Sequence, residues 1–142
     1  MVKASATPML ELRDLHVYYG RAHVLQGVSL TLDHGVLAVV GRNGMGKTTL
    51  CNAIMGLIPA RGSIKVAGRE IVGLPPNEIV KLGLGYVPQG RRVWPSLSVD
   101  EHLRLAVSGG RKGPWTVDGV YDVFPRLAER KSHGGGQLSG GE

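Results

Sequence analysis

Cysteine, aromatic residues and long hydrophobic runs are scarce in this chain of 142 residues. Cys51 is the only cysteine, so no disulfide can form within the chain, which is typical of a reducing compartment. Aromatic residues make up 5% of the sequence, which argues against the stacking surfaces that bind single-stranded nucleic acid. No apolar run approaches the roughly 18 residues that a membrane-spanning helix needs, and residues 1–10 lack the apolar core of a signal peptide. These absences favour a soluble, cytoplasmic chain.

Glycine and positive charge, in contrast, are abundant. The chain has 22 glycines, about twice the average usage, and its hydrophobic fraction of 42% excludes a disordered chain. Seventeen Lys and Arg against eleven Asp and Glu give a formal net charge of +6. The basic residues are scattered, and the densest pairs are Arg91-Arg92 and Arg130-Lys131. Ordinary surface charge is therefore favoured over a nucleic-acid-binding surface, and the glycines are expected at particular turns.

The apolar residues predict two kinds of strand. They alternate with polar residues in 10–19, 24–32 and 63–67, which indicates strands with one solvent-facing side. Val36–Val40 is a continuous apolar run, which is typical of a strand buried on both faces in a parallel sheet. Leu84–Val87 is predicted to be a second short apolar strand. The chain is thus predicted to be an α/β protein, with amphipathic strands followed by a central buried one.

Helices are predicted between and after these strands. Lys47–Leu57 carries an apolar stripe, and residues 77–82 follow a pair of prolines that suits the first turn of a helix. Ser98 and Glu101 form a capping box, in which each side chain bonds to the backbone of the other. A further short helix is predicted at 117–124.

The segment Gly41–Thr48 matches the pattern G-x-x-x-x-G-K-[ST] at every fixed position, between a predicted strand and a predicted helix. Glycines let the backbone wrap around a phosphate, and the helix N-terminus adds free N–H groups and partial positive charge. Lys47 would place its charge on the β and γ phosphates, and the Thr48 hydroxyl would complete a Mg²⁺ shell. Cys51, one turn further on, is interpreted as a buried small residue rather than a reactive thiol.

Four features in this order resemble the ATP-binding cassette (ABC) family. Tyr19 precedes the phosphate loop like the family's adenine-stacking aromatic residue, and Gly41–Thr48 is the phosphate loop itself. Tyr86–Gln89, which reads Tyr-Val-Pro-Gln, is similar to the family's Q-loop. Leu138–Glu142 matches the family signature LSGGE at every position. The resemblance implies the fold of an ABC-type P-loop NTPase, truncated: an N-terminal antiparallel β subdomain, a RecA-like core and the start of a helical subdomain.

The resemblance also implies a role for each matching residue. Tyr19 would stack on adenine, with Tyr18 as the alternative, and Gln89 would reach Mg²⁺ and the attacking water. Ser139 and the two glycines after it would act in trans, because cassettes of this family dimerise head to tail around ATP. The implied catalytic residues are Lys47 and Gln89, and the implied metal ligands are Thr48 and Gln89. The implied contacts to ATP are Tyr19, Gly41, Arg42, Asn43, Gly44, Met45, Gly46, Lys47, Thr48, Thr49, Ser139, Gly140 and Gly141.

Residues 86–99 and 122–127 narrow the resemblance within the family. They are similar to the ATPase subunits of branched-chain amino-acid importers and of urea or amide importers. The implied function is to bind MgATP and couple its hydrolysis to uptake of a small solute. The implied partners are a second ATPase subunit, a transmembrane permease and, indirectly, a solute-binding protein, with no nucleic acid. The implied location is the cytoplasmic face of the plasma membrane, as a peripheral subunit.

The expected domain organisation is one partial nucleotide-binding domain over residues 1–142. Residues 8–35 would begin the β subdomain, and 36–90 would run from the phosphate-loop core to the Q-loop. Residues 91–137 would form the helical subdomain, and 138–142 the signature.

The family's later motifs are not found in these 142 residues. They include an apolar strand ending in Asp-Glu, which supplies the general base, and a switch histidine. We therefore expect an N-terminal portion of an ABC ATPase that is marginally stable and hydrolyses ATP weakly or not at all alone. A non-transport ABC ATPase and a nonfunctional truncated remnant are the alternatives.

Overall fold

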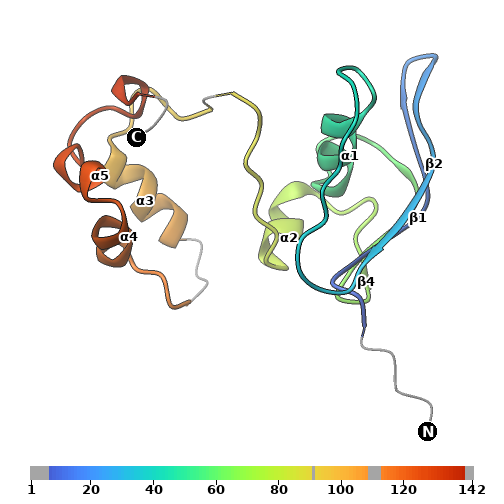
Figure 1. Cartoon of the computed structure of the whole chain (residues 1–142), viewed down its shortest axis with the longest axis horizontal. Coiled ribbons are helices and arrows are strands. Elements are labelled where there is room, and N and C mark those ends of the chain that lie inside the picture. Colours follow the sequence, from blue (N-terminus) through green and yellow to red (C-terminus); the bar gives the residue numbers. More distant parts are fainter. Residues whose placement is uncertain (1–6, 91, 109–112, 140–142) are drawn as a thin grey trace, which may run out of the picture. The chain divides into compact units, whose positions relative to one another are not determined.

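The structure, a computed structural model, describes residues 7–90, 92–108 and 113–139 (Figure 1). The chain divides into two compact units, Met1–Tyr86 and Val87–Glu142, and each is described here by itself. No helix in the described ranges is long and apolar enough to cross a membrane.

The first unit contains a four-stranded antiparallel sheet in the order β2-β1-β3-β4. Its strands are β1 (Leu10–Tyr19), β2 (Ala22–Leu32), β3 (Arg61–Val66) and β4 (Arg69–Glu70). Strands β1 and β2 form a hairpin, and β1 also pairs with β3 (Figure 1). The strands predicted from alternating apolar residues are confirmed as β1, β2 and β3. In each of them, one face packs on the core and the other faces solvent.

Helix α1 (Lys47–Ile54) covers the apolar side of this sheet. Leu12, Leu15 and Val17 of β1 are buried in one cluster with Leu50 and Ala53 of α1. Burying such a large aliphatic side chain contributes about 1.5–3 kcal/mol, so this contact is the main support of α1. The cluster also includes Leu25, Met55, Ile64, Ile71 and Ile79, the last from α2 (Pro76–Lys81).

Helix α1 is shorter than the sequence predicted. It ends at Ile54 rather than Leu57, and Gly56 follows with a φ of 65°. The backbone N–H groups of Met55 and Leu57 still bond to carbonyls of the last turn. A glycine in the left-handed conformation therefore ends the helix before the downstream proline could.

The prediction of two buried strands, at 36–40 and 84–87, is wrong for the part of the chain that the structure describes. Val36–Val40 has no strand assignment, and Val36 and Val40 are 96% and 88% exposed. Leu84–Val87 likewise forms no strand. An apolar run becomes a central strand only when neighbouring strands bond to both of its edges. Within the described residues, neither segment has such a neighbour.

The second unit is helical, with α3 (Val99–Ser108), α4 (Val117–Val123), α5 (Pro125–Glu129) and the 3₁₀ helix η1 (Gly135–Gln137). The predicted capping box is confirmed: Ser98 N donates to Glu101 Oε2 (2.7 Å), and Glu101 N donates to Ser98 Oγ (3.3 Å). Tyr121 donates its hydroxyl to Asp100 Oδ1 at 3.0 Å, which ties α4 to α3.

The carboxylate of Glu70 holds β4 against β3. It accepts hydrogen bonds from Ser63 Oγ (2.5 Å) and Ile64 N (2.9 Å), and also from the backbone N–H groups of Ile71 and Val72. Burial raises the pKa of Glu70, but the donated hydrogen bonds outweigh burial and hold the pKa below its ordinary value. The ionised form is therefore the one that stabilises this end of the sheet.

We expect Glu70→Ala to lower the free energy of unfolding by about 1–2 kcal/mol at neutral pH, because four donors lose one acceptor group. Since the folded pKa is lowered, the stabilisation is present above the unfolded pKa and is lost as pH falls through the folded value. Urea denaturation of both proteins at about pH 7 and about pH 3 measures this. Glu129→Ala, at an exposed carboxylate paired with Arg126, is the control. A difference of the same size at both pH values would contradict the assignment.

Candidate nucleotide-phosphate site

The loop Gly41–Gly46 leads directly into α1, and two of its glycines have backbone conformations that other residues avoid. Gly44 and Gly46 have φ values of 83° and 87°. A Cβ on Gly46 would lie 2.9 Å from Leu25 Cδ2, so the loop also needs glycine for its close approach to β2. The Gly46 carbonyl accepts the first helical bond, from Leu50 N at 2.8 Å. The loop thus leaves the first N–H groups of α1 without helical partners.

The ammonium group of Lys47 folds back onto the loop. Its Nζ donates to the carbonyl oxygens of Gly41 (2.7 Å) and Arg42 (2.8 Å). An ammonium group has three N–H donors, so one remains for a further acceptor. No carboxylate pairs with Lys47 among the described residues. The loop therefore concentrates one positive charge and several free N–H groups at a helix N-terminus, which suits phosphate oxygens.

The two threonines after Lys47 differ in their surroundings. The side chain of Thr48 is exposed, whereas Thr49 is buried. The Thr48 hydroxyl can therefore reach a ligand at the loop, and a contact from Thr49 would fall to its backbone N–H in the first turn. Among the described residues, no group of three His, Cys, Asp or Glu could hold a metal ion. A Mg²⁺ ion at this site would take its oxygen ligands from Thr48, phosphate and water, a donor set that Mg²⁺ accepts.

The two tyrosines at the end of β1 lie on opposite faces of the strand. The Tyr18 ring has two partners: His23 stacks on it at 4.1 Å between centroids, and the Arg61 guanidinium lies 5.7 Å from its centroid. Tyr19 follows the face of Val17, which packs toward α1. Tyr19 is 48% exposed and has no aromatic or cation–π partner among the described residues. Tyr18 is almost as exposed, at 44%, so the two tyrosines differ in their ring partners and not in exposure.

The predicted Q-loop begins at Tyr86, the last residue of the first unit, and the remaining predicted site residues belong to the second unit. Tyr86 donates its hydroxyl to Asn52 Oδ1 of α1 at 2.9 Å, which fixes the start of the predicted Q-loop. Gln89 is exposed within the second unit, as is Ser139 after η1. Gln89 and Ser139 are therefore described within the second unit, whereas the phosphate loop belongs to the first. Gly140 and Gly141 lie outside the described residues.

The structure corrects one sequence interpretation and reveals contacts that the sequence did not signal. Cys51 is exposed rather than buried, because it lies on α1 between the buried Leu50 and the next inward position, Ala53. The Tyr86–Asn52 bond joins residues 34 positions apart, and no motif in the sequence indicates it. Only the register of β1 and β3, in which His16 pairs with Arg61, places those two side chains together.

The fold and the loop define the class of the chain: a nucleotide-phosphate-binding protein with a glycine-rich P-loop at the N-terminus of a helix. The sequence pattern of the ABC transporter family matches residues 25–142. The chain belongs to the ABC transporter family.

Individual relatives agree with this assignment. The chain is 38% identical over 138 residues to the high-affinity branched-chain amino acid transport ATP-binding protein BraG of Pseudomonas aeruginosa, covering 94% of this chain and 59% of BraG. It is 37% identical to the probable branched-chain amino acid transport ATP-binding protein LivF of Archaeoglobus fulgidus, covering 94% of this chain and 58% of LivF. A solved ATP-binding subunit of an ABC transporter superposes with a TM-score of 0.77 at 30% identity, covering 94% of this chain and 57% of that one. The chain thus spans about three-fifths of the length of each of these three relatives.

Proposed function

We propose that the chain is the ATP-binding portion of the ATPase subunit of an ABC importer. The observation that carries the proposal is the phosphate loop, with Lys47 Nζ held between the carbonyls of Gly41 and Arg42 at the start of α1. The names of BraG and LivF, both ATP-binding proteins of branched-chain amino-acid transport, support this role and this solute. Relatives named for ribose and methionine also match, so the solute is the finer part of the proposal.

Each residue of the loop has a separate task in binding. The free N–H groups of the first turn of α1 and the third N–H of Lys47 would hold the β and γ phosphates. The Thr48 hydroxyl would hold Mg²⁺, which supplies charge neutralisation of the phosphates when it is bound. Tyr19 would stack on adenine, since Tyr18 is occupied by His23 and Arg61.

Hydrolysis needs a general base beside the γ phosphate. The adjacent carboxylates of Asp100 and Glu101 do not suit that role. Asp100 accepts hydrogen bonds from Arg104 and Tyr121, which hold the pKa of its carboxyl below the ordinary value. Glu101 caps α3 through Ser98. Both carboxylates therefore serve the helical unit. We infer that these 142 residues bind MgATP but turn it over weakly or not at all alone.

In an assembled transporter, we propose that the chain acts together with other subunits. Ser139, Gly140 and Gly141 would contact the ATP of a second ATPase subunit arranged head to tail, and Gln89 would sense Mg²⁺ and the attacking water. A transmembrane permease would receive the movement, fed by a solute-binding protein. The subunit would be peripheral on the cytoplasmic face of the membrane.

The two tyrosines give a direct test of nucleotide recognition. We expect Tyr19→Ala to weaken MgATP binding about fivefold to a hundredfold, because base–aromatic stacking contributes about 1–3 kcal/mol. Tyr18→Ala removes a ring of the same size from the next position and should leave the affinity within about twofold. Calorimetric titration of each variant and of the wild type with MgATP measures both changes in affinity. Equal losses in the two variants would show that neither ring stacks specifically on adenine.

A further inference from the structure

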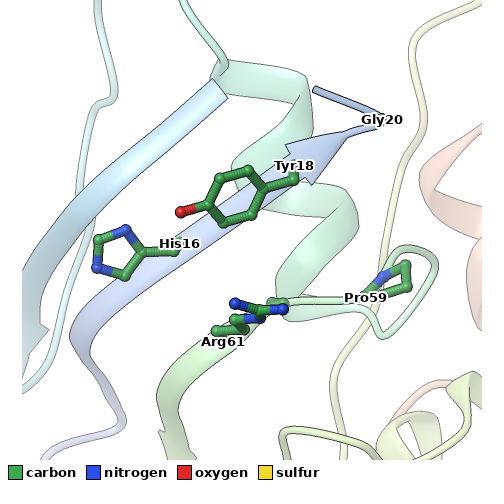
Figure 2. A pocket seen from close by; sticks show the side chains of 6 residues that line it. His16, Tyr18, Gly20, Pro59 and Arg61 are labelled. Atoms are coloured by element: carbon green, nitrogen blue, oxygen red, sulfur yellow. The ribbon is translucent and has the colours of Figure 1, made fainter. Parts of the chain in front are cut away.

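A cavity of about 410 Å³ lies beside the end of β1 and the start of β3 (Figure 2). His16, Tyr18 and Gly20 line it from β1 and its turn, and Pro59, Ala60 and Arg61 line it from the segment that begins β3. None of these residues belongs to Gly41–Thr48. The side chains of His16 and Tyr18 lie on the face of β1 opposite the buried Val17. None of the residues proposed above to contact the nucleotide lines the cavity, although Tyr19 lies between two residues that do.

The charge in this cavity comes from Arg61. Its guanidinium lies 5.7 Å from the centroid of the Tyr18 ring, and Figure 2 shows the two side chains on neighbouring strands. Among the described residues, no carboxylate forms an ion pair with Arg61. Arg13, on the same sheet, differs in this respect because Glu11 pairs with it at 2.6 Å. Arg61 thus presents its N–H donors beside the cavity with no anion to receive them.

A series of contacts along β1 and across to β2 holds this arrangement in place. The Tyr18 ring stacks on His23, and His23 Nε2 lies 2.9 Å from His16 Nδ1. His16 Nε2 lies 3.0 Å from Asp14 Oδ1. When His16 Nε2–H donates to Asp14, its Nδ1 accepts from His23 Nε2–H, so both hydrogen bonds are made with neutral rings. Both ring nitrogens of His16 and Nε2 of His23 are thus engaged, whereas no carboxylate among the described residues pairs with Arg61.

A second cavity of the same volume lacks this chemistry. It also measures about 410 Å³, and its lining contains residues such as Ile64, Ile71 and Leu74 and no charged side chain. Volume therefore does not distinguish the two cavities, whereas the guanidinium does. A planar guanidinium fork fits the two oxygens of a carboxylate or a phosphate group, and a volume of this size accommodates a small molecule.

We propose that the cavity beside Arg61 binds the oxyanion group of a small molecule, a phosphate or a carboxylate. Arg61 supplies the fork of donors, Tyr18 fixes the plane of the guanidinium, and Pro59 and Ala60 form the apolar wall. The site is independent of MgATP, and occupation of one does not require the other.

Titration of the ¹⁵N-labelled chain by NMR tests the proposal, with inorganic phosphate in one arm and acetate in the other, at constant ionic strength. We expect saturable shifts of the Gly20 and Ala60 amides with at least one probe, and the probe that saturates identifies the group as phosphate or carboxylate. Arg61→Gln should weaken this binding about tenfold or more, because it removes a charge-assisted pair of hydrogen bonds. Arg61→Lys keeps the charge but not the planar fork of donors. Its affinity for the probe should lie between those of the wild type and Arg61→Gln.

Matched variants separate this inference from the proposed function. Arg13→Gln removes an equal charge from the same sheet and should leave the Gly20 and Ala60 shifts unchanged. Lys47→Ala should abolish MgATP binding and leave the oxyanion titration intact. The inference is overturned if neither probe saturates, or if Arg13→Gln weakens binding as much as Arg61→Gln. A chain that binds the probe at Arg61 but not MgATP would instead refute the proposed function alone.

Discussion

Replacing Lys47 with alanine is expected to weaken MgATP binding at least about a hundredfold. The variant removes the charge that the loop holds between the Gly41 and Arg42 carbonyls, together with the hydrogen bond that Lys47 would donate to phosphate. A hydrogen bond to a charged group contributes about 1.5–3 kcal/mol, and the lost charge attraction adds to it, so a hundredfold, about 2.7 kcal/mol, is the lower bound. Calorimetric titration of wild type and variant with MgATP measures the difference.

Lys81→Ala is the matched control for this experiment. It removes the same charge from an exposed site on α2, where Lys81 pairs with Glu78 at 2.7 Å. We expect it to change the affinity for MgATP by less than about twofold, because exposed charges at a distance are screened by salt. A loss of equal size in Lys81→Ala would mean that net charge, rather than the loop, attracts the nucleotide. An unchanged affinity in Lys47→Ala would remove the loop from the site.

Gly62→Ala has the largest expected effect on stability. Gly62 is on β3 with a φ of 108°, opposite an irregularity of β1 where Asp14 has a φ of 48°. A Cβ on Gly62 would lie 2.3 Å from the Asp14 carbonyl oxygen and 2.7 Å from that of Arg13. Backbone atoms cannot move away as a flexible side chain can, so the β1–β3 pairing must open. We expect a loss of about 3 kcal/mol or more in the free energy of unfolding.

Gly20→Ala provides the comparison, since it changes the same residue type at a second left-handed position. Gly20 has a φ of 57°, and a Cβ there would have no atom within 4 Å. Only backbone strain opposes this change, and we expect a loss of about 1 kcal/mol. Urea denaturation followed by circular dichroism measures both variants. Equal losses would show that the register of β1 and β3 differs from the one described.

Local patterns in the sequence predicted much of the fold. Alternating apolar residues located β1, β2 and β3, because one buried face suffices to create that pattern. The Ser98–Glu101 capping box was predicted and is confirmed, because its contacts are local. The sequence also indicated an N-terminal antiparallel sheet and the ABC transporter family, and both are confirmed.

The errors arose where structure depends on distant partners. Val36–Val40 has the composition of a central strand, but a strand also needs neighbours, and composition does not supply them. Cys51 was expected to be buried because cysteine usually is, whereas the rotation of α1 turns it outward. The contacts among Asp14, His16, His23 and Arg61 follow from strand register, which no local pattern specifies. The predicted roles of all the site residues remain predictions, those of Tyr19, Lys47 and Thr48 as much as those of Gln89 and Ser139.

Calorimetric titration of the wild-type chain with ATP, in Mg²⁺ and again in EDTA, tests the central claim most directly. We expect saturable binding of one ATP per chain that weakens when Mg²⁺ is removed, because Thr48 and the phosphates would hold the ion together. Absence of saturable binding, by a chain whose circular dichroism shows the described strands and helices, would contradict the assignment of the phosphate loop.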